Sequence, residues 1–157
     1  MKTLLICIGK TNERYWQDAI EEYMKRLRKY SPFELIEIPD IRNTKSMTEQ
    51  QIKQAEGENI LRTLNSDDYV TLLDDKGQQH TSLQFAEWYQ QRMSSGIKRL
   101  VFIVGGPYGF SQDIYKRANS KLSLSRLTFS HQLVRPIFLE QLYRAQTILH
   151  NEPYHHE

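Results

Sequence analysis

One stretch constrains this chain most: a buried strand that runs directly into a glycine-rich loop. Residues 100–104 read LVFIV, a short apolar run rich in β-branched residues, which is typical of a strand inside a core. Gly105, Gly106 and Gly109 follow at once. Glycine has no Cβ, so backbone there can approach a ligand closely. Ligands of open parallel sheets lie outside the carboxyl ends of the strands. We therefore expect a binding site at the end of this strand.

The glycine loop alone does not identify the ligand. It lacks the Gly-Lys-Ser/Thr ending of a phosphate loop and the G-x-G-x-x-G spacing of a dinucleotide fingerprint, so a tight turn explains it equally well. The segment that follows favours a functional interpretation. Residues 122–129 read LSLSRLTF, and His131 and Arg135 come next at a spacing of four, which places them on one face of a helix. A glycine loop beside a His/Arg pair predicts an enzyme.

Four motifs make the prediction specific: V-G-G-x-x-G, L-S-x-S-x-L-T-F-x-H-x-x-x-R, E-Q-x-Y-R-A and a terminal Y-H. They comprise Val104, Gly105, Gly106, Gly109, Leu122, Ser123, Ser125, Leu127, Thr128, Phe129, His131, Arg135, Glu140, Gln141, Tyr143, Arg144, Ala145, Tyr154 and His155. Together they resemble the ribosomal large subunit methyltransferase H family. This family belongs to the SPOUT superfamily of S-adenosylmethionine-dependent RNA methyltransferases. The similarity covers the whole chain.

The resemblance implies a fold and an assembly. Strands alternating with helices already indicate an α/β protein with a mostly parallel sheet between helices. Periodicity does not reveal a knot, and chains normally avoid them. The family implies a C-terminal trefoil knot and a homodimer whose two subunits finish the site. The apolar stripe of the last helix gives local support to a second copy. At 157 residues the chain is expected to form one domain.

The resemblance also implies site residues. The cofactor would be S-adenosylmethionine, bound by Leu72, Gly105, Leu124, Ser125, Arg126, Leu127, Thr128 and Phe129. The family methylates N3 of a pseudouridine in 23S ribosomal RNA. That nitrogen must lose a proton, and histidine is the default base near neutral pH. The candidate catalytic residues are His131, Arg135 and His155. The candidate RNA-binding residues are Tyr143, Arg144 and Tyr154, through stacking and phosphate contacts.

The periodic patterns predict five strands and five helices. Strands are expected at residues 3–8, 33–38, 69–73 and 100–104, and within 121–129. Helices are expected at 15–27 after an Asn12 cap, at 49–64 after Thr48, from a Ser82 cap to 94, after Ser111, and at 133–149. Residues 74–77 carry paired aspartates and are interpreted as a turn rather than a metal or catalytic site.

Composition narrows the classes of protein to which this chain can belong. Apolar content is 39%, charged content 25% and net charge +2, which is a globular mixture whose charge does not by itself diagnose RNA binding. No apolar run approaches the roughly 18 residues of a membrane span. The single cysteine, Cys7, sits in an apolar strand, which favours a packed thiol and the cytoplasm. No metal site and no membrane partner are expected.

Three questions stay open at this point. Short polar ends usually fray, which would make Tyr154 and His155 incidental; otherwise the tail reaches the methyl acceptor. A related methyltransferase acting on transfer RNA would share the fold, and only substrate assays separate the two. A non-catalytic dimeric RNA-binding protein that assists ribosome assembly would differ by not binding S-adenosylmethionine.

Overall fold

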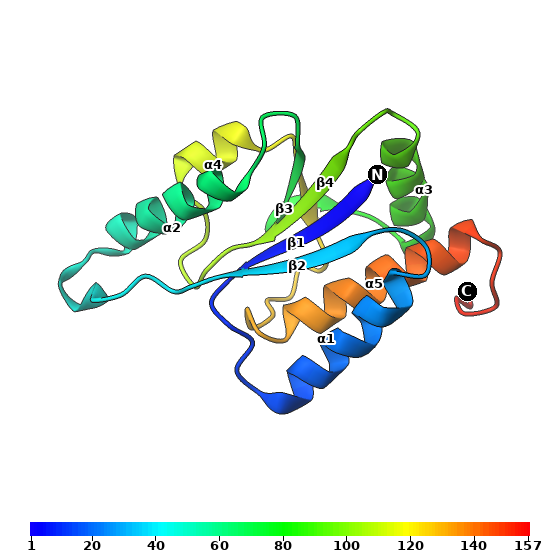
Figure 1. The fold of residues 1–157 in the computed structure, drawn as a ribbon, viewed down its shortest axis with the longest axis horizontal. Helices are drawn as coiled ribbons and strands as arrows, with labels where there is room; N and C mark the ends of the chain where they lie inside the picture. Colours follow the sequence, from blue (N-terminus) through cyan, green and yellow to red (C-terminus); the bar gives the residue numbers. More distant parts are fainter.

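The computed structural model describes residues 1–157 and contains one five-stranded sheet (Figure 1). Its strands are β1 (Lys2–Ile8), β2 (Phe33–Ile38), β3 (Tyr69–Gln79), β4 (Arg99–Val104) and β5 (Ser120–Ser123). They lie in the order β2-β1-β4-β3-β5, and every neighbouring pair is parallel. The helices are α1 (Arg14–Leu27), α2 (Glu49–Thr63), α3 (Ser82–Met93), α4 (Gln112–Arg117) and α5 (Val134–Leu149). A single 3-10 turn, η1, spans Thr44–Ser46.

The helices cover the sheet in two layers. Helices α1, α3 and α5 pack against one face, and α2 and α4 lie together on the other (Figure 1). The central strands are buried on both faces: Leu5 and Cys7 belong to the core under α1, α3 and α5, whereas Leu4 and Ile6 belong to the core under α2 and α4. Strands covered on both sides carry unbroken apolar runs, which explains the sequence of β1 and β4. The predicted α/β fold with a parallel sheet is confirmed; the knot stays a prediction.

Most predicted elements are present, with three differences. Glu13, not Asn12, is the residue before α1, and the Asn12 backbone N–H donates to the Gln132 side chain at 3.0 Å. Thr81 caps α3 in place of Ser82 and forms a reciprocal capping box with Gln84.

The third difference is the length of β3. Leu73 and Gln78 both pair with Leu122 of β5, so the four residues between them bulge out of a strand that continues to Gln79. The predicted turn at 74–77 is therefore an excursion within a longer strand. Gly77 belongs to this bulge, and a Cβ there would lie 2.7 Å from the backbone N of Leu122.

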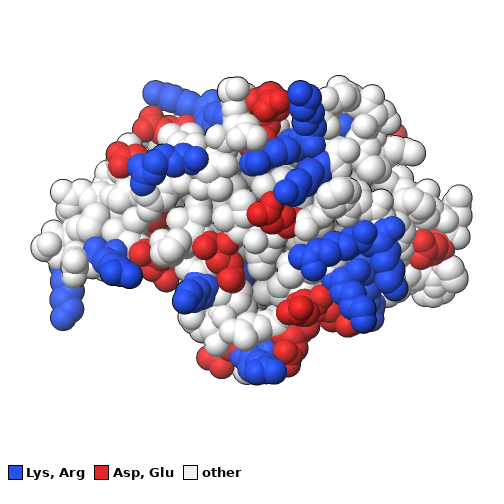
Figure 2. Space-filling model, in the orientation of Figure 1, with Lys and Arg blue, Asp and Glu red and all other residues white.

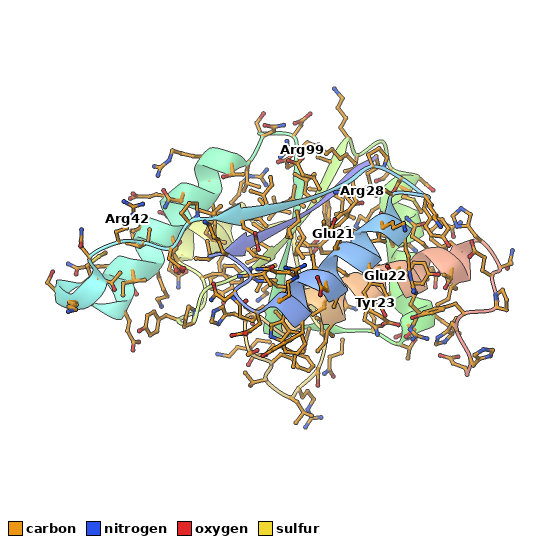
Figure 3. All side chains as sticks on the ribbon, turned by 60° about the horizontal axis from the view of Figure 1, so that its bottom comes forward. Glu21, Glu22, Tyr23, Arg28, Arg42 and Arg99 are labelled. Atoms are coloured by element: carbon orange, nitrogen blue, oxygen red, sulfur yellow. The ribbon has the colours of Figure 1, made fainter.

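Charge is distributed in small groups over the surface. Figure 2 shows Lys and Arg gathered over the C-terminal end of α1, where Lys25, Arg28 and Lys29 are exposed. Figure 3 shows Glu21 and Glu22 on α1 and Arg28 just after its end, with Arg42 on the loop at the opposite end of the molecule. Acidic side chains thus interrupt the basic face.

No helix in the protein is both long enough and apolar enough to cross a membrane.

Candidate functional site

A cavity of about 350 Å³ opens at the carboxyl edge of the sheet, beside the bulge in β3 and beyond the ends of β4 and β5. This volume is in the usual range for a small-molecule site. The wall consists of strand ends, the glycine loop and the segment before α5; it is lined by Leu73, Asp74, Asp75, Val104, Gly105, Gly106, Pro107, Phe110, Tyr115, Leu122, Leu124, Ser125, Leu127, Thr128, Phe129, Ser130, His131 and Val134. The cavity lies where the glycine loop predicted a binding site.

The glycine loop is closed by a short turn. The N–H of Gly109, at a φ of 85°, donates to the carbonyl of Gly106 at 3.1 Å. The space behind the loop is filled, since a Cβ on Gly106 would lie 2.6 Å from the carboxylate of Glu56. A Cβ on Gly105 would meet the Phe110 ring at 3.2 Å. The second glycine is thus required by a buried carboxylate, and the first by an aromatic ring that itself lines the cavity.

The segment from β5 to α5 folds into a compact turn against the cavity. The Ser123 hydroxyl donates to the carbonyl of Ser125 at 3.0 Å, and the Leu127 N–H donates to the Ser125 hydroxyl at 2.9 Å. Leu127 is 76% exposed, the highest value among the large hydrophobic residues. Of the eight predicted cofactor residues, six line the wall: Gly105, Leu124, Ser125, Leu127, Thr128 and Phe129.

Two predicted cofactor residues lie off the wall. Leu72 is fully buried in the core under α2 and α4, and its neighbour Leu73 lines the cavity in its place. Successive side chains of a strand point to opposite faces, so only one of the two leucines can face the site. Arg126 is exposed and is not part of the wall.

The paired aspartates, interpreted as turn residues, belong to the cavity wall. The Tyr115 hydroxyl donates to Asp74 Oδ2 at 2.6 Å, and the Lys76 N–H donates to Asp74 Oδ1 at 2.9 Å. Burial opposes ionisation of this carboxyl, but the two hydrogen bonds, together with contact to Asp75 and the charge of Lys121, outweigh it and lower the pKa of Asp74. Burial and the same hydrogen bond raise the pKa of Tyr115 to about 12. The one signal in the sequence was the place of Asp74, directly beyond the predicted end of a strand.

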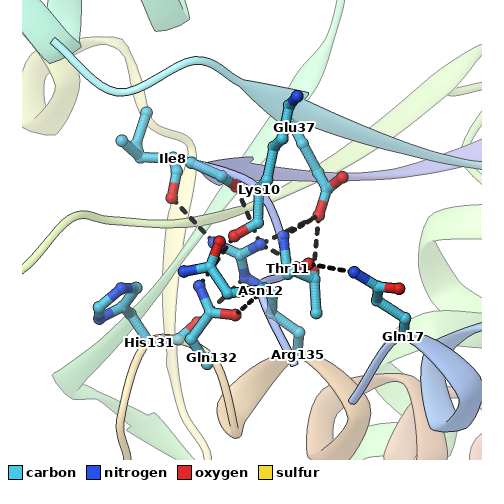
Figure 4. Close-up of polar contacts among 10 residues, drawn as sticks. Ile8, Lys10, Thr11, Asn12, Gln17, Glu37, His131, Gln132 and Arg135 are labelled. Atoms are coloured by element: carbon cyan, nitrogen blue, oxygen red, sulfur yellow. Dashed lines mark hydrogen bonds and ion pairs between the residues drawn. The ribbon is translucent and has the colours of Figure 1, made fainter. Parts of the chain in front are cut away.

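Arg135 lies outside the cavity and is fully buried (Figure 4). Its guanidinium donates to five protein acceptors at 2.8 to 3.1 Å: the carbonyl oxygens of Ile8, Gly9 and His131, the hydroxyl of Thr11 and the carboxylate of Glu37. This differs from the expected catalytic role, because a guanidinium engaged in this way does not reach a substrate. It joins the start of α5 to β1 and β2 and holds the backbone of His131.

His131 itself is exposed and lines the cavity. It follows directly from the cofactor segment, and the Nε of Arg135 binds its carbonyl oxygen at 3.1 Å. Of the three predicted catalytic residues, His131 alone has its side chain at the cavity.

The C-terminal tail packs against α5 and does not fray. The Tyr154 hydroxyl donates to Glu140 Oε1 at 3.0 Å, and Arg144 contacts the same carboxylate at 2.5 Å. The other guanidinium nitrogen of Arg144 lies 3.1 Å from His155 Nδ1. The ring of Tyr154 packs edge-on against Tyr143, with centroids 4.8 Å apart. The structure therefore brings together Tyr143, Arg144, Tyr154 and His155. Glu140, which belongs to a motif but was not predicted as a site residue, completes this tail cluster.

This tail cluster does not line the cavity of its own subunit. The cavity wall reaches Val134 at the beginning of α5, whereas the tail is bound through Glu140 and Arg144. These two residues lie further along the helix by a rise of about 9 and 15 Å at 1.5 Å per residue. Within a subunit, His131 therefore lines the cavity and His155 does not.

Comparison with known proteins decides the family. A family model described as predicted SPOUT methyltransferase matches residues 1–155. The chain belongs to the SPOUT methyltransferases. The match covers every element of the fold, from β1 through α5 and most of the tail.

Curated relatives of this SPOUT methyltransferase are similar over their full length. A protein of Parabacteroides distasonis is 57% identical over 157 residues, covering 100% of both chains. One of Christiangramia forsetii is 54% identical over 156 residues, covering 99% of both, and one of Bacteroides thetaiotaomicron is 48% identical over 157 residues, covering 100% of both. Each is named ribosomal RNA large subunit methyltransferase H. The resemblance read from the motifs is thereby confirmed.

Proposed function

We propose that this SPOUT methyltransferase transfers a methyl group from S-adenosylmethionine to N3 of a pseudouridine in large-subunit ribosomal RNA. The proposal is supported by the printed name of its full-length relatives. The single observation that carries it is the cavity at the carboxyl edge of the sheet, whose wall contains the glycine loop and most of the predicted cofactor segment.

The wall suits a nucleoside without phosphates. Half of its 18 residues are hydrophobic, and none is Lys or Arg, so no cation is present to hold a phosphate chain. Backbone groups of Gly105 and of the turn at Ser125 and Leu127 are close enough to the cavity to read an adenine edge. When bound, S-adenosylmethionine supplies an electrophilic methyl group. The chain itself binds and orients the donor, and much of the barrier is lowered by such alignment.

His131 is the proposed proton acceptor. An imide nitrogen becomes nucleophilic when it loses its proton, and an exposed imidazole at the cavity wall can accept that proton near neutral pH. Arg135 acts on this step through position alone: it holds the carbonyl of His131 and so fixes where the ring enters the cavity.

We further propose that the protein acts as a homodimer. The apolar stripe of α5 does not support this, since Phe138, Leu142 and Ala145 pack in the core of their own subunit. The support is the tail cluster, whose histidine, arginine and two tyrosines do not line the cavity of the same chain. Two subunits that cross with α5 helices antiparallel would bring the tail cluster of each to the cavity of the other.

The experiment is methyl transfer from labelled S-adenosylmethionine to purified ribosomes, isolated large subunits and naked ribosomal RNA. We expect label in large-subunit RNA, in a single 3-methylpseudouridine identified by mass spectrometry. Label in transfer RNA would support the alternative methyltransferase. Absence of both transfer and S-adenosylmethionine binding would support an assembly protein instead. A cytoplasmic location stays a prediction.

A further inference from the structure

The charges on the cavity wall have one sign. Among its 18 residues are Asp74 and Asp75, one histidine, and no Lys or Arg. The nearby Lys121 lies over the Tyr115 ring, 5.7 Å from its centre, and is not part of the wall. A concave site lined by one sign of charge concentrates its field inside the cavity. A molecule bound there therefore meets a negative environment.

Of the two aspartates, Asp74 is better placed to act on a molecule bound in the cavity. Each of its carboxylate oxygens accepts one hydrogen bond, from the Tyr115 hydroxyl at 2.6 Å and from the Lys76 N–H at 2.9 Å. These contacts hold the carboxylate in place and leave lone pairs free on both oxygens. Tyr115 lines the same cavity, so the carboxylate and its support move as one unit. Asp75, by contrast, is exposed.

We propose that Asp74, positioned by Tyr115, makes the cavity discriminate between the cationic methyl donor and its neutral product. This inference rests on the proposed function. During transfer the bond from the methyl carbon to sulfur breaks and its electron pair remains on sulfur. The methyl carbon bonds to the RNA nitrogen, whose proton has passed to the base. The sulfonium charge is thereby lost, and with it the attraction to the carboxylate. The carboxylate thus weakens product binding relative to donor binding.

Asp74 is ionised at neutral pH. Burial raises the pKa of its carboxyl, but the hydrogen bonds from Tyr115 and Lys76, together with contact to Asp75 and the charge of Lys121, lower the pKa by more. The carboxylate is therefore charged at neutral pH. Opposite charges several ångströms apart near a protein surface change affinity by about five- to tenfold at low salt, and the effect falls as salt screens it.

The test compares two probes, S-adenosylmethionine and S-adenosylhomocysteine, by calorimetry. In Asp74→Asn the ratio of the two affinities should shift against S-adenosylmethionine by about five- to tenfold relative to wild type. Tyr115→Phe, which frees the carboxylate, should shift it in the same direction by a smaller factor. In wild type the ratio should fall from low to high salt, and in Asp74→Asn, where Asp75 keeps its charge on the wall, it should fall by less. Asp18→Asn makes the same charge change on the α1 surface and should leave the ratio unchanged.

Two results would overturn the inference. An equal loss of affinity for both probes would mean that Asp74 contacts a part they share, such as the ribose or the ammonium group. An unchanged ratio with unchanged affinities would mean that the carboxylate does not sense the ligand. Both differ from failure of the proposed function, in which wild-type protein binds neither probe. Each variant should unfold at the same midpoint temperature as wild type, which shows that the fold is retained.

Discussion

The guanidinium of Arg135 donates to the carboxylate of Glu37 at 3.1 Å and so joins the start of α5 to the edge strand β2, 98 residues earlier in the chain. The same side chain reaches the carbonyls of Ile8 and Gly9 at the end of β1. One buried cation thus fixes α5 against two strands, and it does so one helical turn from His131.

Replacing Arg135 with Met should lower the free energy of unfolding by about 3 kcal/mol, because removal of one partner leaves a half-buried carboxylate and several carbonyls without donors. Urea denaturation measures the change. Arg14→Met, on an 87% exposed arginine paired with Asp18, is the control and should cost less than about 0.5 kcal/mol. A similar small loss for both variants would show that the Arg135 network does not support the fold.

Glu56 should make stability depend on pH. Burial, and then the charge of Asp40, raise the pKa of Glu56 from 4.5 to about 6. A raised folded-state pKa means that the stabilising contribution is full below pH 4.5 and is lost as pH rises through about 6.

Glu56→Gln should therefore match wild type at pH 4 and exceed it at pH 8 by about 1 kcal/mol, a value reduced for partial solvent screening. Denaturation at both pH values provides the measurement, with the exposed Glu58→Gln as control. Equal effects of Glu56→Gln at the two pH values would contradict the assignment.

Cys7 should be unreactive in the folded protein. Burial in the core raises the pKa of its thiol to about 12, against a smaller opposing effect of Arg135. Only the thiolate attacks disulfide reagents. Labelling with such a reagent at pH 8 should be at least about 10²-fold slower in native protein than in denaturant. Equal rates would mean that β1 opens readily.

Much of the fold could be predicted from periodic patterns, because the unbroken apolar runs of β1 and β4 and the Thr48 capping box are local signals. The prediction that failed concerned the direction in which a side chain points. A spacing of four places His131 and Arg135 on one helical face, but it does not say which points inward. The helix begins only at Val134, and Arg135 turned into the core.

Other parts depended on contacts that no local pattern encodes. The bulge in β3 is specified by pairing with β5, about 45 residues later in the chain, so the place of Asp74 after a predicted strand was not enough to identify it as a wall residue. Gly57 is a residue of low helix propensity inside α2, and packing explains it: a Cβ there would lie 2.5 Å from the Ser111 hydroxyl that caps α4. Likewise, the position of His155 outside the cavity depends on its contact with Arg144, eleven residues earlier in the chain.

Deletion of residues 154–157 should separate cofactor binding from catalysis. The tail contacts Glu140 and Arg144 in the middle of α5, and neither residue lines the cavity, so S-adenosylmethionine affinity should be nearly unchanged. Methyl transfer to ribosomes should fall by a factor of about 10² or more, the scale of a lost acid–base group. Unchanged transfer would leave His131 as the only base candidate, and lost cofactor affinity would place the tail in the binding step.

The central claim is that S-adenosylmethionine binds in the cavity at the carboxyl edge of the sheet, and a blocked cavity tests it most directly. Thr128 is exposed on the wall and its side chain makes no hydrogen bond, so Thr128→Trp fills the space without removing a contact of the fold. Gln91→Trp, on the exposed face of α3, is the matched control. In a calorimetric titration with S-adenosylmethionine we predict binding by wild type and Gln91→Trp, and at least about a 10²-fold loss of affinity in Thr128→Trp. Wild-type affinity in folded Thr128→Trp would contradict the account.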